Sequence, residues 1–285
     1  MLAKLIKYDF RSIKRFGVPV IITLLVATVL GTVNMLVLVS SINNMQPDAE
    51  VPFLRSLLLL GSWAMMFLCF ALVSLATVGM QVLICVDFYK SLVSDEAYLT
   101  FTLPVKAQDI LRSKLINAFI WSLIVSAAAI LSVCIMVFVG IVPLVGWEEF
   151  VAPFELGPIS LEIVFDLGVM TVLGILLSLI SIVNGLLLYF MAIFFASVIA
   201  RKHKILTAIA CVYGVNMIYS ILSAIAMPIV SVFGTLLGVI FSFGADPTFG
   251  VINVTLLLGC ILLTGMNILF YYLTKHMMEK KLNLP

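Results

Sequence analysis

Long apolar runs, separated by short polar stretches, dominate the chain. About 20 residues of helix cross a hydrocarbon core of ~30 Å, and six of the runs reach that length. The pattern therefore predicts an all-α integral membrane protein with six transmembrane helices in a single domain spanning residues 1–285. The six predicted spans cover residues 17–40, 56–86, 115–143, 167–200, 205–227 and 250–274.

The segment before the first run, residues 1–16, has the pattern of an amphipathic helix. Apolar side chains recur at helical spacing and cations fill the other positions. Such a helix lies in the headgroup layer with its cations near anionic lipid. We expect an interfacial helix, which serves either as an orientation signal for the first span or as a contact for a partner. The apolar set is Leu2, Leu5, Ile6, Phe10 and Ile13, and the cationic set is Lys4, Lys7, Arg11, Lys14 and Arg15.

The longest polar interruption covers residues 86–114, between the second and third runs. It holds four of the sixteen Lys and Arg residues and four of the fourteen Asp and Glu residues. Ser94 is suited to cap a short helix whose first turn contains Asp95 and Glu96, and Pro104 ends that helix. The pattern predicts a helix, a short helix and another helix, divided by two breaks. This segment is the surface best suited to meet a soluble partner.

The basic residues gather in alternate polar segments. Fifteen of the sixteen lie in residues 1–16, 86–114, 201–204 and 275–285, and the intervening loops keep only Arg55 beside eight acids. The positive-inside rule therefore predicts that both termini are cytoplasmic in a multi-pass protein of the cell membrane. The eight acids are Asp48, Glu50, Glu148, Glu149, Glu155, Glu162, Asp166 and Asp246.

Pro228 is predicted to end the fifth span. The apolar stretch that follows, 229–243, is too short to cross the bilayer, and residues 244–247 close it. A seventh span here would move the basic tail to the outer side. We therefore expect a re-entrant or interfacial hairpin on the outer side, packed against protein because backbone exposed to lipid must be hydrogen-bonded. The stretch contains Gly234-x-x-x-Gly238, a small-residue packing motif that also occurs by chance in apolar sequence.

Composition excludes a soluble domain and offers little catalytic chemistry. Hydrophobic residues make up 64% of the chain and charged residues 11%, with a mean hydropathy of +1.27. The five cysteines lie in apolar runs without a C-x-x-C pair, which is typical of buried small side chains. His203 and His276 have no Glu or Cys partner at metal-ligand spacing, and the sequence has no G-x-S-x-G and no Walker loop. We expect no catalytic residues, no metal site and no cofactor in this chain.

Amides are the main polar groups inside the apolar runs. An unpaired amide in hydrocarbon is costly, so each is expected to face protein or a wet path. Interhelical hydrogen bonds of about 1 kcal/mol explain most of them. We take Asn34, Gln81, Asn184 and Asn216 as candidates for a substrate path; the remaining amides are Asn117, Asn253 and Asn267. Ionisable residues are absent from mid-span, which argues against a proton- or sodium-coupled carrier and favours an external energy source.

Residues 94–106, SDEAYLTFTLPVK, resemble the cytoplasmic segment after the second span in ABC transporter permeases of the type 2 export family, Gram-positive bacterial type. An acidic pair, a small residue, Tyr-Leu-Thr, a hydrophobic residue and Thr-Leu-Pro follow in the family's order, and a helix through Ser113-Lys114-Leu115 comes next. Ala97 stands where Gly is usual, and Lys106-Ala107 stands where Ser-Arg is often seen. The sharp match covers 13 of the 285 residues.

The resemblance implies a coupling helix that docks on a separate ATPase subunit, with residues 1–16 as a second contact. It also implies an assembly of two permeases and two ATPases, in which the partner hydrolyses ATP and the substrate path lies between the permeases. The cytoplasmic coupling segment would be 87–114. The docking residues implied are Ser94, Asp95, Glu96, Ala97, Tyr98, Leu99, Thr100, Phe101, Thr102 and Leu103.

Two other classes of function stay open. One is a membrane scaffold or sensor partner that binds a cytoplasmic protein through the same segment without transport. The other is a membrane-embedded enzyme, for which the sequence offers no catalytic set. For an exporter, spans rich in amides and free of charge favour amphipathic or apolar cargo such as a peptide, drug or lipid. No feature indicates nucleic-acid binding, and the pattern leaves a homodimer and a heterodimer equally open.

Overall fold

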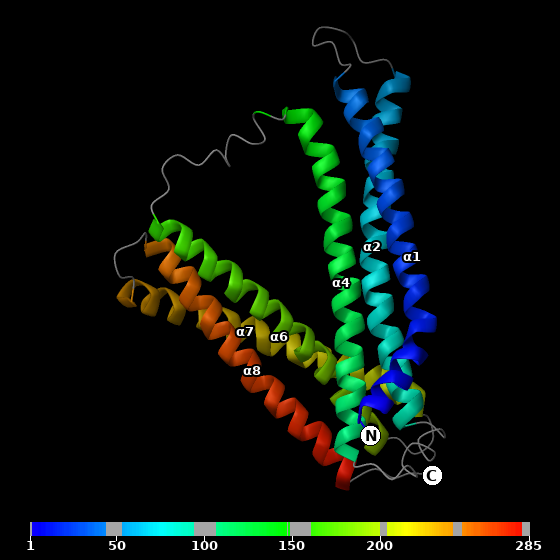
Figure 1. Ribbon diagram of the computed structural model, residues 1–285, viewed down its shortest axis with the longest axis vertical. Coiled ribbons are helices and arrows are strands. Elements are labelled where there is room, and N and C mark those ends of the chain that lie inside the picture. The colour runs from blue at the N-terminus through cyan, green and yellow to red at the C-terminus, as the bar shows by residue number, and fades with distance from the viewer. Residues whose placement is uncertain are drawn as a thin grey trace. The chain divides into compact units, whose positions relative to one another are not determined.

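The computed structural model describes residues 2–43, 53–93, 107–146, 148, 161–199, 204–241 and 247–280. Six helices in these ranges are long and apolar enough to cross a membrane, which confirms the six-helix prediction and indicates a multi-pass membrane protein whose described part is helical. They are α1 (Leu2–Asn43), α2 (Phe53–Leu92), α4 (Ala107–Val145), α6 (Leu161–Ile199), α7 (Lys204–Phe241) and α8 (Pro247–Lys280) (Figure 1).

The helices belong to two compact units. The α6–α8 unit contains Met1–Asp9, Cys85–Phe119 and Pro158–Pro285, and the α1–α2–α4 unit contains Phe10–Ile84 and Ile120–Gly157. Helices α1, α2 and α4 each contribute one end to the α6–α8 unit and continue along the chain into the other unit.

In the α1–α2–α4 unit the three helices run side by side (Figure 1). The Thr28 hydroxyl donates to Ser132 Oγ at 2.7 Å and joins α1 to α4. The Asn34 amide donates to the Ser62 carbonyl at 2.8 Å and joins α1 to α2. Thr28 and Asn34 are thus paired with neighbouring helices, as hydrocarbon surroundings favour.

A glycine lets α1 approach α4 closely. A Cβ on Gly17 would lie 2.5 Å from the Trp121 ring, so only a hydrogen fits at this position. Phe10 stacks on the same ring, with centroids 5.2 Å apart. The small residue at the contact allows the backbones to come together and dispersion contacts to accumulate.

In the α6–α8 unit, helices α6, α7 and α8 pack against one another (Figure 1). Leu187 and Leu188 of α6 and Phe270 of α8 form a buried cluster. Leu115 of α4 and Tyr271 of α8 pack against it. The beginning of α4 is therefore part of this unit's core.

The predicted end of a helix at Pro228 is wrong. Helix α7 continues through Pro228 to Phe241, so the expected hairpin over 229–243 is not a separate element in the part of it that the structure describes. Proline removes one backbone hydrogen bond, but opening the helix into a hairpin would leave many more backbone groups without partners in an apolar setting. A continuous helix is the less costly solution. At 38 residues it is about 57 Å long, which exceeds the hydrocarbon core.

Packing against α8 also supports the second half of α7. A Cβ on Gly234 would collide with the Thr255 side chain, and one on Gly238 would collide with the backbone of Val251. The Gly234-x-x-x-Gly238 motif thus marks a close contact between two helices, the use expected of small residues in membrane spans.

The amphipathic segment is not a separate helix either. Helix α1 begins at Leu2 and passes Gly17 and Pro19 without a break, whereas the sequence predicted an interfacial helix ending at residue 16. A single glycine costs a helix only about 1 kcal/mol. The proximity of Gly17 to Trp121 provides packing that offsets this cost.

Candidate functional site

A lysine is buried near the beginning of α4. Lys114 is only 7% exposed, and its neighbour Ser113 is fully buried. An ammonium group removed from water is stable only when it is paired and hydrogen-bonded. The residues around Lys114 therefore identify a built polar site.

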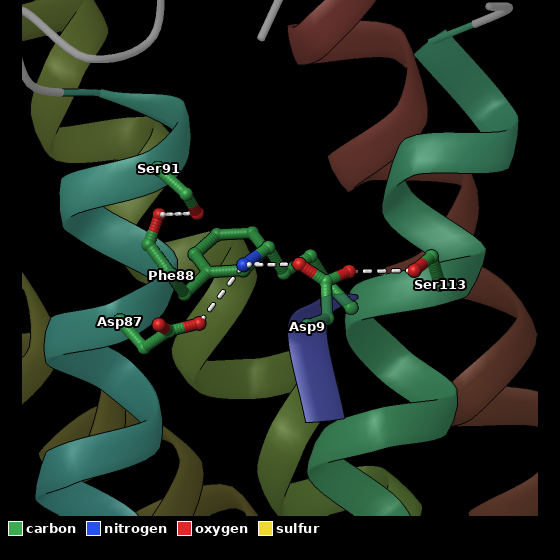
Figure 2. A network of polar contacts seen from close by, with 6 residues as sticks. Asp9, Asp87, Phe88, Ser91 and Ser113 are labelled. Carbon is green, nitrogen blue, oxygen red and sulfur yellow. Dashed lines mark hydrogen bonds and ion pairs between the residues drawn. The ribbon is translucent and has the colours of Figure 1, made fainter. Parts of the chain in front are cut away.

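Two carboxylates pair with Lys114. Its Nζ lies 2.9 Å from Asp9 Oδ1 and 2.9 Å from Asp87 Oδ2. The Ser113 hydroxyl donates to Asp9 Oδ2 at 2.6 Å. Figure 2 shows Asp9 between Asp87 on one side and Ser113 on the other. We call Asp9, Asp87, Ser113 and Lys114 the Lys114 cluster; it joins the beginning of α1, the end of α2 and the beginning of α4.

The local sequence explains why these charges are buried. Lys114 lies on a stripe of α4 that also carries Ile110, Leu111 and Ala118, all of which are buried. Residues three or four positions apart share a helix face, so the packing that buries the apolar residues also buries the lysine. Asp9 follows Ile6 by three positions and is likewise in register with the apolar side of its helix.

Aromatic packing surrounds the α2 side of the cluster. Phe88, next to Asp87, is buried and stacks on Phe190 of α6 with ring centroids 3.7 Å apart. Phe194 meets Phe88 edge-on at 5.3 Å. The Ser91 hydroxyl donates to the Phe88 carbonyl at 3.2 Å, one turn further along α2 (Figure 2). The end of α2 is thereby fixed to α6 as well as to α4.

The charges of the cluster fit a structural role, in which it holds three helix ends together, better than a catalytic role. Two carboxylates and one ammonium give a formal charge of −1, and the lysine is bonded to both acids. Removing one member of such a buried set typically costs about 3–5 kcal/mol, because it leaves an uncompensated charge. Among the described residues, no group of three or more His, Cys, Asp or Glu side chains is arranged to hold a metal ion.

The cluster flanks the segment that resembles a coupling element. Helix α2 ends at Leu92, where the Val93 amide donates to the Tyr89 carbonyl at 2.9 Å, and α4 begins at Ala107. Asp87 and Lys114 therefore fix the helix ends on either side of residues 94–106. The ten docking residues expected from the sequence, Ser94 to Leu103, lie outside the described part of the chain.

The four candidate path amides have different surroundings. Asn184 of α6 is buried and donates to Asn267 Oδ1 of α8 at 3.0 Å, and Asn34 bonds to α2 as described above. Asn216 is exposed, with its Nδ2 3.5 Å from the Tyr189 hydroxyl, and Gln81 is exposed on α2. Asn34 and Asn184 thus serve as interhelical links, the role that the sequence predicts for most of the amides.

Asn117 differs from the linking amides Asn34 and Asn184. It is fully buried one turn beyond Lys114, and neither its Oδ1 nor its Nδ2 has a hydrogen-bond partner. An unsatisfied buried amide costs about 1–3 kcal/mol. The unpaired Asn117 lies beside the Lys114 cluster, on the same face of α4.

Sequence reasoning missed the Lys114 cluster although a signal was present. Asp9 is the first acid of the chain and stands alone in a basic segment. An acid in register with an apolar stripe indicates a buried partner. The sequence does not reveal which residue is that partner, because Ser113 and Asp9 are 104 positions apart.

Comparisons of the chain with protein-family models, with curated proteins and with solved structures found no match. The candidate site is accordingly described by the residues and contacts of this chain alone.

Proposed function

We propose that this chain is the membrane-spanning permease subunit of an ATP-driven ABC exporter, coupled to separate ATPase subunits. One observation carries the proposal: a segment with the residue order of a coupling element, 94–106, stands between two helix ends that a buried ion-pair cluster holds together. The order of residues supports docking, and the cluster supports transmission of force.

A displacement of residues 94–106 by a partner would reach the spans only if the helix ends beside the segment are fixed. A loop on flexible ends would absorb a displacement, whereas a loop between fixed helix ends passes it on. Asp87 and Lys114 connect α2 to α4, and Asp9 adds α1. All three helices continue into the α1–α2–α4 unit. A partner that moves residues 94–103 would therefore move three spans together.

The proposed assembly contains two permease chains, identical or homologous, and two ATPase subunits, with the substrate path between the permeases. Both termini and residues 87–114 would be cytoplasmic, as the distribution of basic residues favours. The beginning of α1 would be a second ATPase contact. ATP would be hydrolysed by the partner, which would tilt the coupling helices and open the path outward. Exposed Gln81 and Asn216 are the amides best suited to face cargo of amphipathic or apolar chemistry.

A pull-down from the native membrane tests the proposal. The detergent-solubilised wild type would be compared with Glu96→Lys and Tyr98→Ala, which alter the segment, and with Glu148→Lys, which makes the same charge change in a loop predicted to lie on the other side. We expect an ATPase with a Walker loop to co-purify with the wild type and with Glu148→Lys, and to be lost with the other two. Monodisperse elution of every variant would show that each is folded.

Two results would contradict the proposal. One is the absence of an ATPase under several mild detergents. The other is undiminished ATPase binding by Glu96→Lys and Tyr98→Ala. Either result would favour the alternative of a non-transport scaffold or sensor partner, whose cytoplasmic binding protein would then be identified from the same eluate.

A further inference from the structure

An arginine and a tyrosine meet where α4 begins and α8 ends. Arg112 Nε donates to the Tyr271 hydroxyl at 3.3 Å. Figure 1 shows these two helix ends side by side. Since Leu115 and Tyr271 both pack on the buried α6–α8 cluster, the contact belongs to a packed part of the molecule. The hydroxyl fixes the guanidinium by its Nε and leaves both terminal nitrogen groups to donate elsewhere.

Two cations lie at this place. Arg112 is exposed, and Lys275 follows Tyr271 by one turn on the same face of α8. Among the side chains that the structure describes, no carboxylate lies within salt-bridge distance of Arg112 or Lys275, although Asp109, one turn before Arg112 on α4, attracts the guanidinium. The surface therefore presents two basic groups with donors that an anion could accept from.

Exposed apolar side chains lie next to these cations, on the side toward the middle of α4 and α8. Ile116 is exposed one turn further along α4, and Ile268 is exposed one turn before Tyr271 on α8. Ile116 and Ile268 therefore both lie toward the apolar middle of their helices. Tyr271 and Tyr272 occupy the boundary, where tyrosines gather at the interface between membrane and water. A bound molecule would meet donors at one end and hydrocarbon at the other.

We infer that the α4–α8 junction binds one anionic phospholipid of the surrounding bilayer. Its phosphate lies against the Arg112 guanidinium, with Lys275 nearby, and an acyl chain follows Ile116 and Ile268. Arg112, Tyr271 and Lys275 form the headgroup site. The inference does not depend on the proposed export function, because any membrane protein with this junction would hold the lipid.

The charge and the shape of the α4–α8 junction favour an anionic phospholipid as the ligand. A planar guanidinium donates two parallel hydrogen bonds to a phosphate, and Tyr271 orients it before binding. A second cation favours a lipid with net negative charge over a zwitterionic one, whose choline would face Lys275. The apolar surface beneath favours a lipid over a soluble phosphate, because only the lipid buries it.

Native mass spectrometry of the purified chain in a mild detergent tests the site. Dioleoyl phosphatidylglycerol, dioleoyl phosphatidylcholine and soluble glycerol phosphate would be titrated separately against the wild type, Arg112→Gln, Tyr271→Phe and Lys90→Gln. Lys90 is an exposed lysine at the end of α2 in the same unit and provides the matched control. A melting curve without added lipid would show that each variant is folded.

We expect the wild type to bind the first phosphatidylglycerol about tenfold more tightly than phosphatidylcholine, and Arg112→Gln to remove most of that preference. Tyr271→Phe should weaken phosphatidylglycerol binding about threefold, and Lys90→Gln should not change it. Equal binding of the two lipids by the wild type would overturn the inference. So would an equal effect of Arg112→Gln and Lys90→Gln, or binding of glycerol phosphate as tight as that of the lipid.

Discussion

At the scale of single residues, Lys114 links the ends of three helices. It is buried, it bonds to acids from two other helices, and its neighbour Ser113 bonds to one of them. A buried ion pair is weak evidence for stability, because desolvation offsets much of the attraction. Its clearer effect is on geometry, since each helix end has one position that satisfies the charges.

Replacing Lys114 should expose this dependence. In Lys114→Met, Asp9 and Asp87 would face each other without a cation, and we expect the free energy of unfolding to fall by about 3–5 kcal/mol. In the triple variant Lys114→Met, Asp9→Asn, Asp87→Asn the repulsion is absent, so most of the loss should be recovered. Denaturant unfolding in mixed micelles measures both.

Lys90→Met provides the control, since it removes a lysine that is exposed on α2. It should leave stability unchanged within about 0.5 kcal/mol. If the single and triple variants were equally unstable, the cluster would contribute by shape alone and the ionic account would be wrong.

At the scale of elements, hydrophobic patterning predicted six helices correctly because run length and the bilayer thickness together determine what can cross. It was wrong at Pro228, because the expectation that proline ends a helix comes from helices in water, whereas α7 lies in an apolar setting. The helix expected to follow the break at Pro104 does begin close to that residue, since α4 starts at Ala107. Packing partners, which a single sequence does not reveal, decide such ends.

The α7–α8 contact gives a prediction at this scale. Gly238→Ala would drive a methyl group against the Val251 backbone, and overpacking of this kind costs about 1–3 kcal/mol. Gly214→Ala, on the same helix with open space around it, should be neutral or stabilising by up to about 1 kcal/mol. The comparison uses the melting temperature in detergent.

The opposite order of the two variants would show that α7 does not pack on α8 through this face. Equal effects would mean that helix propensity, and not contact, governs both positions. Either outcome would weaken the explanation that packing on α8 stabilises the part of α7 that follows Pro228.

At the scale of the whole molecule, the chain is a multi-pass membrane protein in which the buried Lys114 is paired at the ends of three helices. Composition and charge distribution predicted the membrane class and led to the proposed orientation. The sequence signals a buried partner for Asp9 but does not identify the Lys114 cluster, because it unites residues from α1, α2 and α4 that only the fold brings together. The resemblance of residues 94–106 led to the function proposed for the segment between these ends.

The most direct test of that function is photo-crosslinking in living cells. A photoreactive phenylalanine analogue would replace Tyr98 in the segment, and in a second strain it would replace Trp147 in a loop predicted to lie on the other side. We expect Tyr98 to crosslink to an ATPase that carries a Walker loop, and Trp147 to give no such product. Crosslinking of the ATPase from both positions, or from neither, would contradict the account.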